Sequence, residues 1–270
     1  MPRINVLDKH VAELIAAGEV VDRPCSVVKE LVENSVDAGA TNITVEIKDG
    51  GNTFIRVTDN GCGIEKEDIP KAFLRHATSK IGTEYDLERI CTFGFRGEAL
   101  ASIAAVSHAE MLTRAKGAEM GYHCEATDCE IGEPMEAGCP EGTTIVVRDL
   151  FYNTPARQKF LKKDVSEANA VAQIMDKLAL SYPEVKFSFI RDGETKLSTY
   201  GNGDMLTAIS SVYGREFADN MLEVNYSSMA KPGFAVKGYI TRPSATKASR
   251  NFQNFFINRR FVKTRTAMAA

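Results

Sequence analysis

The sequence lacks the features that would place the chain in a membrane or on a secretory route. Its 270 residues contain no apolar stretch near the roughly 18 residues that cross a bilayer, and residues 1–5 carry no apolar signal-peptide core. Its six cysteines form no Cys-x-x-Cys, and its four histidines form no His-x-x-x-His. Zinc sites are therefore disfavoured, the thiols are expected to be reduced, and the chain is expected to be cytoplasmic.

Two common nucleotide-binding signatures are absent as well. The chain contains neither the Gly-x-x-x-x-Gly-Lys-[Ser/Thr] of a P-loop nor the Gly-x-Gly-x-x-Gly of a dinucleotide-binding fold. A nucleotide, if bound, would need a different phosphate cradle. A helix entered through glycines can supply one, because the first N–H groups of a helix bind anions.

Acidic residues are missing from one end of the chain. From Val224 to Ala270 there are nine Lys or Arg and no Asp or Glu, so the first 223 residues hold 24 basic and 36 acidic residues, a charge of −12. The hydrophobic content of 44% is enough for a core in each part. A glycine-rich linker at Gly201 to Asp204 precedes an amphipathic helix at 205–213, and we predict the domain boundary there.

The first strong pattern predicts a helix from Pro24 to about residue 37. Its apolar residues recur at 27, 28, 31, 32 and 36 and form one stripe. Glu30, Asn34 and Asp37 fall within about 60° of one another on the opposite face. A solvated face is the common interpretation of such a pattern. However, Asn is a poor helix former, and its place in the middle of a helix is a departure that often marks a functional site.

Alternating apolar residues predict an antiparallel hairpin at 43–47 and 55–57, with a turn at 49–52. It ends in the polar loop 59–63. Further predictions are helices at 68–77, 99–106 and 167–181, strands at 108–113, 122–126, 143–147 and 185–190, and a long mobile connection ending near Phe95. Asn153-Thr154-Pro155 predicts an N-cap and first turn for a helix that carries Arg157, Lys159, Lys162 and Lys163.

Several of these segments could serve nucleotide hydrolysis. Glu30 could act on water and Asn34 could ligate Mg²⁺ through its amide oxygen. Asp59 could accept a hydrogen bond from an exocyclic amine, which would favour adenine over guanine. Each segment taken alone has a simpler alternative, because an Asp-Asn-Gly run and a glycine-rich helix entry are more often plain turns.

Taken together, the segments resemble the MutL family of DNA mismatch repair proteins, in order and nearly in wording. The matching blocks are residues 15–24 (IAAGEVVDRP), 30–40 (ELVENSVDAGA), 59–64 (DNGCGI), 76–80 (HATSK), 94–100 (GFRGEAL), 151–157 (FYNTPAR) and 256–260 (FINRR).

The resemblance covers essentially the whole chain and implies an α+β fold. It predicts a GHKL (Bergerat) ATPase α/β sandwich at 22–202, with a mixed sheet, helices on one face and the ATP lying between. The start of a ribosomal-S5-domain-2-like α/β domain follows at 203–270. A gyrase-like or chaperone ATPase would share Glu30, Asn34 and Asp59, but it would not explain the blocks at 77–80 and 94–100.

The family's functional residues map onto matching positions of this chain. Glu30 becomes the general base, Asn34 the Mg²⁺ ligand and Asp59 the adenine reader. The remaining residues implied to contact ATP are Asp37, Gly63, Thr78, Ser79, Lys80, Phe95, Arg96, Gly97, Glu98, Ala99, Leu100 and Thr143.

The resemblance also implies partners. ATP binding is expected to dimerise the chain through residues 1–21, interpreted as an exchange arm rather than a stable local element. The implied partners are the mismatch-recognition protein MutS and a downstream nuclease or helicase, at the nucleoid of a bacterium. Non-specific DNA binding is expected from Arg242, Lys247, Arg250, Arg259, Arg260, Lys263 and Arg265. The phenylalanines among them are expected to be core residues.

The chain departs from the family pattern at its end. It stops at Ala270, inside the S5-like region, and we expect it to lack a later lysine that reaches the γ-phosphate and any C-terminal endonuclease domain. The expectation of slow ATP hydrolysis is thus weaker than that of ATP binding. The alternative is a DNA-binding repair scaffold without efficient ATP turnover.

Overall fold

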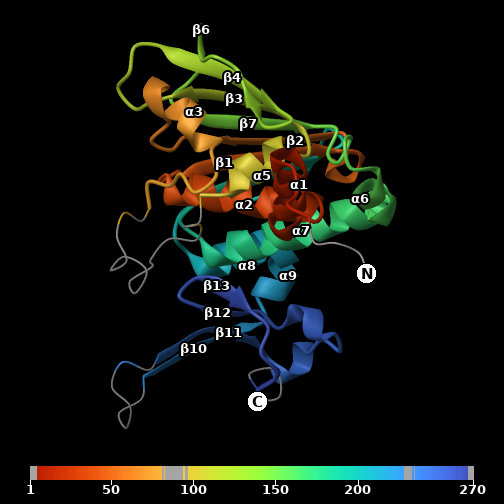
Figure 1. Ribbon diagram of the computed structural model, residues 1–270. Helices are drawn as coiled ribbons and strands as arrows, with labels where there is room; N and C mark the ends of the chain where they lie inside the picture. Colours follow the sequence, from red (N-terminus) through yellow and green to blue (C-terminus); the bar gives the residue numbers. More distant parts are fainter. Residues whose placement is uncertain are drawn as a thin grey trace. The chain divides into compact units, whose positions relative to one another are not determined.

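The structure is a computed structural model of the 270-residue chain, and it describes residues 5–80, 82, 94, 97–227, 233 and 235–266 (Figure 1). The predicted connection that ends near Phe95 lies almost wholly outside these residues, as do the predicted ATP contacts Phe95 and Arg96. The chain forms two compact units, residues 1–174 with 188–196 and residues 175–187 with 197–270.

Nine strands of the described chain form one sheet in the order β5-β4-β3-β7-β2-β1-β8-β9, with β6 beside β4. The pairs β1–β2, β2–β7, β7–β3, β3–β4, β4–β5 and β4–β6 are antiparallel. The strands are β1 (Asn42–Lys48), β2 (Phe54–Asp59), β3 (His108–Arg114), β4 (Gly121–Thr127), β5 (Glu130–Ile131), β6 (Met135–Ala137), β7 (Gly142–Arg148), β8 (Lys186–Arg191) and β9 (Glu194–Ser198).

Figure 1 shows helices α1, α2 and α5 together on one side of this sheet. The helices of this part of the chain are α1 (Lys9–Val20), α2 (Pro24–Asp37), α3 (Ile69–Ala72), α5 (Ala99–Ala104), α6 (Pro155–Phe160) and α7 (Asp164–Ser181), with 3-10 turns η1 (Asp49–Gly51) and η2 (Lys66–Asp68). The predicted α2 stripe is buried at Val27, Val28, Leu31 and Val32. Its burial on the sheet is the main reason that the helix forms here, and it turns the opposite face of α2 away from the core.

The predicted helix at 68–77 is wrong beyond residue 72. α3 ends there, and His76 adopts a left-handed φ of 62° while its N–H donates to the Gly97 carbonyl at 2.9 Å. That long-range hydrogen bond replaces the local one a helix would need. Strands β5, β6 and β9 were not predicted, because two- to five-residue strands carry little pattern.

The predicted helix after Pro155 is correct, but it is shorter than the charge pattern suggested. α6 ends at Phe160, so Lys162 and Lys163 lie outside it, and the Lys162 N–H donates to the buried Glu167 carboxylate at 3.0 Å. Thr154 occupies the cap position, directly before Pro155. The Asn153 amide instead donates to the Ala105 carbonyl at 2.9 Å.

The N-terminal segment also differs from the expectation of an arm without stable local structure. Residues 9–20 form α1, which packs against α5, and Ala17 and the following Val21 are fully buried. Only one face of the helix is buried, because the apolar side chains of Val11 and Ile15 on α1 are about half exposed. Tertiary packing on α5 supplies the stability that the isolated sequence could not.

Beyond the end of α7, the described residues of the second unit form two helices and two hairpins. They are α8 (Met205–Tyr213), α9 (Arg215–Ala218), the antiparallel pair β10 (Met221–Ser227) and β11 (Ala235–Thr241), the 3-10 turns η3 (Pro243–Ala245) and η4 (Arg250–Phe252), and the antiparallel pair β12 (Phe255–Ile257) and β13 (Arg260–Val262). Leu180, Ile209 and Ala218 form its buried core. Phe256 packs against that core, as expected, whereas Phe252 is 40% exposed, although its ring contacts those of Tyr213 and Phe217.

The five cysteines in the described part of the chain are free thiols. No helix there is long and apolar enough to span a bilayer.

Candidate functional site

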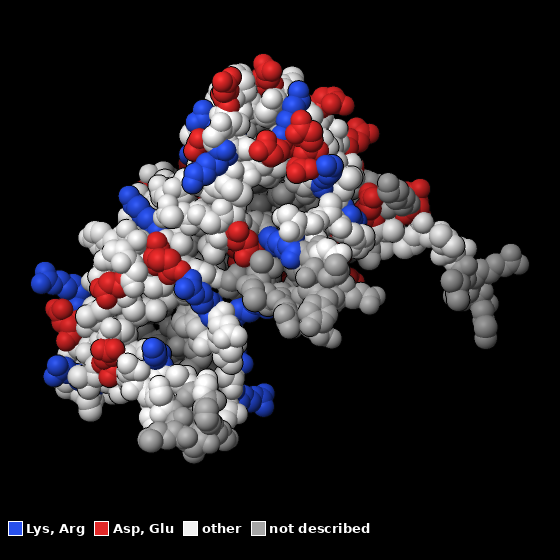
Figure 2. Space-filling model, turned by 90° about the vertical axis from the view of Figure 1, so that its left-hand side faces the viewer, with Lys and Arg blue, Asp and Glu red and all other residues white. Residues whose placement is uncertain are grey.

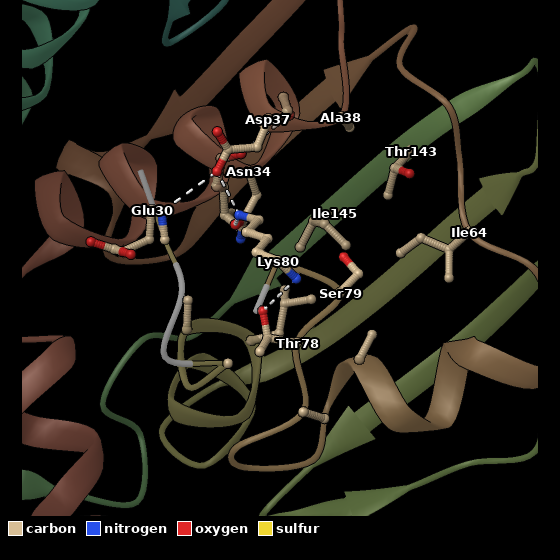
Figure 3. A pocket seen from close by; sticks show the side chains of 18 of the residues that line it. Glu30, Asn34, Asp37, Ala38, Ile64, Thr78, Ser79, Lys80, Thr143 and Ile145 are labelled. Carbon is tan, nitrogen blue, oxygen red and sulfur yellow. Dashed lines mark hydrogen bonds and ion pairs between the residues drawn. The ribbon is translucent and has the colours of Figure 1, made fainter. Parts of the chain in front are cut away.

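One cavity of about 1340 Å³ lies between α2, the ends of β2 and β7, and the segments 76–80 and 97–100 (Figure 3). All the described residues assigned to ATP by sequence line it: Glu30, Asn34, Asp37, Asp59, Gly63, Thr78, Ser79, Lys80, Gly97, Glu98, Ala99, Leu100 and Thr143. These residues are up to 113 positions apart in the chain. The fold therefore brings them to a single site.

Asp59, the last residue of β2, is held by three donors. Its Oδ2 accepts a hydrogen bond from the Ser35 hydroxyl at 2.7 Å, and its Oδ1 accepts from the Gly61 N–H at 2.8 Å and the Thr143 N–H at 3.3 Å. A carboxylate has about four acceptor positions, so one is left to face the cavity. The three donors also fix the rotamer, because they come from α2, the 59–63 loop and β7.

Thr143 is oriented by a buried neighbour, Thr113 of β3. The fully buried Thr113 hydroxyl lies 3.0 Å from the Gly142 carbonyl, 3.0 Å from the Thr143 hydroxyl and accepts from the Ile64 N–H at 3.0 Å. The Thr113 hydroxyl has one proton, and it donates that proton to the Gly142 carbonyl, because a carbonyl can only accept. The Thr143 hydroxyl then donates to Thr113, and its own oxygen remains an acceptor on the cavity side.

Lys80 joins two oxygen-bearing side chains of α2. Its ammonium donates to Asp37 Oδ2 at 2.6 Å and to Asn34 Oδ1 at 3.0 Å (Figure 3). The ion pair is well covered, with side-chain exposures of 18% for Lys80 and 8% for Asp37. A cation therefore already sits on the two oxygens that the sequence assigned to cofactor and metal binding.

Glu30 lies one helical turn before Asn34 and points away from Lys80 in Figure 3. Its carboxylate is 26% exposed and is 3.3 Å from the ammonium of Lys29, which also contacts Glu33 at 3.2 Å. Burial raises the pKa of Glu33, although Lys29 opposes the shift. Glu30 is thus the more accessible of the two carboxylates that pair with Lys29, and it lines the cavity.

Two glycines let the backbone approach closely around the cavity. Gly63 has a φ of 69°, and a Cβ there would lie 2.1 Å from the Arg114 carbonyl oxygen. Gly97 has a φ of 63°, and a Cβ there would lie 2.3 Å from the Ala77 carbonyl oxygen. Neither position accepts a side chain without moving backbone, so both glycines are needed for the shape of the site.

The basic residues assigned to DNA are all exposed in the second unit. Arg259 is not free, since its guanidinium pairs with Glu184 and lies over the Tyr182 ring at 5.5 Å. Lys247 lies over the Phe217 ring at 5.8 Å. The structure thus gathers the basic residues in one unit, but part of their charge is already engaged.

Exposed acidic side chains are numerous around β4 and β6, at the top of Figure 2, where basic side chains lie among them. The exposed acidic residues of this stretch are Glu125, Asp128, Glu130, Glu133, Glu136 and Glu141. An anionic ligand in the cavity of the first unit would depend on backbone N–H groups and on nearby cations such as Lys80. The acidic residues of the surrounding surface would repel such a ligand.

Sequence reasoning did not single out several residues that shape the cavity, among them Ser35, Thr113 and two residues of α1. Ser35 and Thr113 hold Asp59 and Thr143, and α1 adds Glu19 and Val20 to the wall. A serine in the middle of an apolar helix was a usable signal, because Ser is there a poor helix former. Thr113 gave none, since threonine is common in strands.

Comparison with known proteins agrees with this architecture. Residues 23–134 match the family model "Histidine kinase-, DNA gyrase B-, and HSP90-like ATPase", and residues 209–270 match "DNA mismatch repair protein, C-terminal domain". The chain is 48% identical over 264 residues to the DNA mismatch repair protein MutL of Agathobacter rectalis, covering 98% of this chain and 40% of that protein. It is 49% identical to MutL of Shouchella clausii, covering 97% and 39%.

Solved structures agree as well. The Aquifex aeolicus MutL ATPase domain complexed with ADP is 30% identical, with a TM-score of 0.72, covering 93% of this chain and 87% of that one. The N-terminal domain of a DNA repair protein is 28% identical, with a TM-score of 0.79, covering 94% and 79%. The chain spans about 40% of the length of the curated relatives it matches. The expected GHKL fold is confirmed, and the chain belongs to the MutL family of DNA mismatch repair proteins.

Proposed function

We propose that the chain binds ATP with Mg²⁺ in the α2 cavity and hydrolyses it slowly. The observation that carries the proposal is that the predicted ATP-site residues of four sequence blocks, 30–40, 59–64, 76–80 and 94–100, line one cavity together with Thr143. The relative solved with ADP, the Aquifex aeolicus MutL ATPase domain, shares the fold. A cavity of about 1340 Å³ has room for a nucleotide with its water.

Adenine recognition is proposed for Asp59 and Thr143. The remaining acceptor of Asp59 suits the exocyclic amine of adenine, whereas guanine would present a carbonyl oxygen that two acceptors repel. The free acceptor of Thr143 stands beside it. Gly63 allows the flat base to approach the backbone, because no Cβ intervenes.

The amide oxygen of Asn34 fits a Mg²⁺ site of the kind completed by phosphates and water. Mg²⁺ prefers oxygen ligands and keeps several waters, so one amide oxygen from the protein is enough. Among the residues that the structure describes, no cluster of three or more acidic, His or Cys side chains is placed to hold a metal. When bound, Mg²⁺ would neutralise phosphate charge. The hydrogen bond from Lys80 to Asn34 Oδ1 must then break, which frees the Lys80 ammonium to contact a phosphate.

Glu30 is proposed as the general base. An accessible carboxylate beside the cavity can take the proton of the water that attacks the γ-phosphorus. Thr78, Ser79 and the backbone of residues 97–100 line the same cavity and are proposed to contact the phosphates, together with Phe95 and Arg96. Lys29, 3.3 Å from Glu30, is placed to stabilise the negative charge of that base.

Nucleotide binding should depend on Mg²⁺ through Asn34. In isothermal titration with a non-hydrolysable ATP analogue, we expect the affinity to fall about tenfold when Mg²⁺ is removed, and Asn34→Ala to abolish most of that dependence. Asn42→Ala, at an exposed position on β1, is the matched control and should behave as wild type. Equal binding by the wild-type chain with and without Mg²⁺ would contradict the role given to Asn34.

Dimerisation on ATP binding is proposed for the N-terminal region. Val6 is fully exposed, and Leu7, Val11 and Ile15 are 54%, 42% and 51% exposed, an apolar surface that a second copy could cover. Light scattering should give a monomer without nucleotide and a dimer with the ATP analogue. Val11→Asp with Ile15→Asp should keep the chain monomeric at the same occupancy. If the wild-type chain stays monomeric with the analogue bound, the proposed dimerisation is wrong.

In the cell, we propose that this ATP-driven switch couples mismatch recognition by MutS to a downstream nuclease or helicase in the bacterial cytoplasm. The family assignment supports this role, since the relatives are DNA mismatch repair proteins. The alternative is a repair scaffold that binds DNA without efficient ATP turnover. The two differ in whether nucleotide-site variants alter nucleotide handling.

DNA binding is proposed for the basic residues of the second unit, through phosphate contacts without sequence preference. Replacing Arg250 and Lys263 by Glu should weaken binding to any duplex and lower the slope of log affinity against log salt by about 2. Fluorescence anisotropy over a salt series measures both. Lys116→Glu, an exposed lysine of the first unit, should leave the slope unchanged. A slope unaffected by the double variant would remove these residues from the interface.

A further inference from the structure

Helix α1 lies against its own chain and completes the cavity wall. It packs on α5, as Figure 1 shows, with Ala17 and Val21 fully buried. Its last two residues, Glu19 and Val20, line the cavity. Whatever holds α1 in this place therefore also shapes the cavity.

One tether comes from Arg75, just before the cavity segment 76–80. Its guanidinium Nη2 donates to the Glu13 carbonyl of α1 at 2.9 Å. The next residue, His76, donates its N–H to the Gly97 carbonyl at 2.9 Å. Two hydrogen bonds from adjacent residues, Arg75 and His76, thus link α1 to the two cavity segments at 76–80 and 97–100.

The second tether is Arg157 of α6. Its Nη2 donates to the Leu14 carbonyl at 3.0 Å and approaches the Ile15 carbonyl at 3.5 Å. The guanidinium occupies the notch beside Gly18, where a Cβ would lie 1.7 Å from Nη2. α1 has no basic residue in its own last turn, so this cation also complements the negative end of the helix dipole.

A third contact supports the same placement. The Glu13 side chain lies against the Cys129 thiol in the turn between β4 and β5, and burial, followed by Glu13, raises the pKa of Cys129 to about 12. Arg75 is close enough to act on the same thiol. Both sides of the Glu13 residue are therefore engaged, its carbonyl by Arg75 and its carboxylate side by the turn.

We propose that Arg75 and Arg157 are positioning residues that hold α1 on its own chain, and that Gly18 is glycine in order to seat the Arg157 guanidinium. By keeping Glu19 and Val20 in the cavity wall, the two arginines set nucleotide affinity without touching nucleotide. The consequence for nucleotide rests on the proposed function, whereas the seating of α1 does not.

Gly18→Ala separates this proposal from an ordinary helix effect, because the two predict opposite signs. Ala is the better helix former, so on propensity alone the substitution stabilises α1 about fivefold. In the proposed arrangement the added methyl group displaces the guanidinium and removes its hydrogen bonds to Leu14 and Ile15. Charge-assisted bonds of this kind outweigh the propensity gain.

The test is native-state hydrogen exchange of the α1 amides without nucleotide. Gly18→Ala and Arg157→Gln should each lower protection about tenfold, and Arg75→Gln should lower it by a similar factor. In an Arg157→Gln background, Gly18→Ala should instead raise protection about fivefold. Lys159→Gln, exposed on the same helix α6, is the control and should change nothing. Melting curves identify any variant that fails to fold, and Arg157→Lys, which keeps the charge but loses the fork, should be intermediate.

Two results would overturn the proposal. If Gly18→Ala raises protection in the wild-type background, Arg157 does not hold α1, and if Arg75→Gln leaves exchange unchanged, Arg75 does not. Titration of the same variants with the ATP analogue should show affinity about tenfold weaker. Looser α1 with unchanged affinity would refute the cavity-wall role, whereas failure of the wild-type chain to bind nucleotide would refute the proposed function and leave the exchange result standing.

Discussion

Glu30→Ala should leave ATP binding within about threefold of wild type and lower turnover by about 10²- to 10⁴-fold. A positioned general base contributes a factor of that size to turnover. Binding should change little, because Glu30 makes no hydrogen bond to Asp59, the proposed adenine contact, or to the Asn34 oxygen. Steady-state phosphate release and calorimetric titration with a non-hydrolysable analogue measure the two quantities on the same preparation. Glu30→Gln, which keeps the shape but cannot take a proton, should match Glu30→Ala.

Glu65→Gln is the matched control for this experiment. Glu65 also lines the cavity and is exposed. It should keep wild-type turnover. The alternative, a scaffold without efficient turnover, predicts that Glu30→Ala leaves phosphate release unchanged, because the wild-type chain would already hydrolyse almost no ATP. Turnover of the wild-type chain that survives Glu30→Ala would rule out Glu30 as the base.

Asp59→Asn should weaken ATP binding by about 100-fold and narrow the preference for ATP over GTP. The substitution replaces one carboxylate oxygen, an acceptor, by an NH₂ group, a donor. The three partners of Asp59 are themselves donors, so the NH₂ group loses their hydrogen bonds; they are the Ser35 hydroxyl and the N–H groups of Gly61 and Thr143. The loss of one or two charge-assisted hydrogen bonds accounts for the size. Competition titration with ATP and GTP measures both affinities.

The preference for adenine is the sharper part of this test. In the wild-type chain the free acceptor of Asp59 should meet the amine of adenine and repel the carbonyl of guanine. In Asp59→Asn the new NH₂ can donate to that carbonyl, so GTP affinity should rise while ATP affinity falls. Ser35→Ala, which removes one orienting donor and keeps the carboxylate, should weaken ATP by a smaller factor and leave the preference for ATP intact. A folded Asp59→Asn chain with unchanged ATP affinity would refute the assignment.

The sequence predicted well those elements whose pattern is local and strong. The α2 stripe and the β1–β2 hairpin repeat at periods of 3.6 and 2 over enough residues to be unambiguous, and both formed with bounds within about two residues of the prediction. The residues of the cavity were found because their blocks resemble one family. Their convergence could be expected from that resemblance but not from spacing.

Both helices that are shorter than predicted end where a group outside the helix accepts the hydrogen bond of a backbone N–H. The helix expected to reach Ala77 ends at Ala72, because the His76 N–H bonds to the distant Gly97 carbonyl. α6 ends at Phe160, because Glu167 accepts the Lys162 N–H. In the first place a carbonyl 21 residues away, and in the second a side chain five residues on, satisfies a backbone N–H that the local pattern would assign to a helix.

The sequence by itself determined which residues can carry the chemistry and which faces of the helices and strands are buried, because residue type and periodicity are local properties. Only the tertiary structure decided how those residues are held: Lys80 on Asn34 and Asp37, Ser35 on Asp59, Thr113 on Thr143, and two arginines on the carbonyls of α1. Each of these contacts joins groups 24 to 143 residues apart. A hydrogen bond needs its atoms within about 3 Å, and no local pattern sets such a distance between segments so far apart.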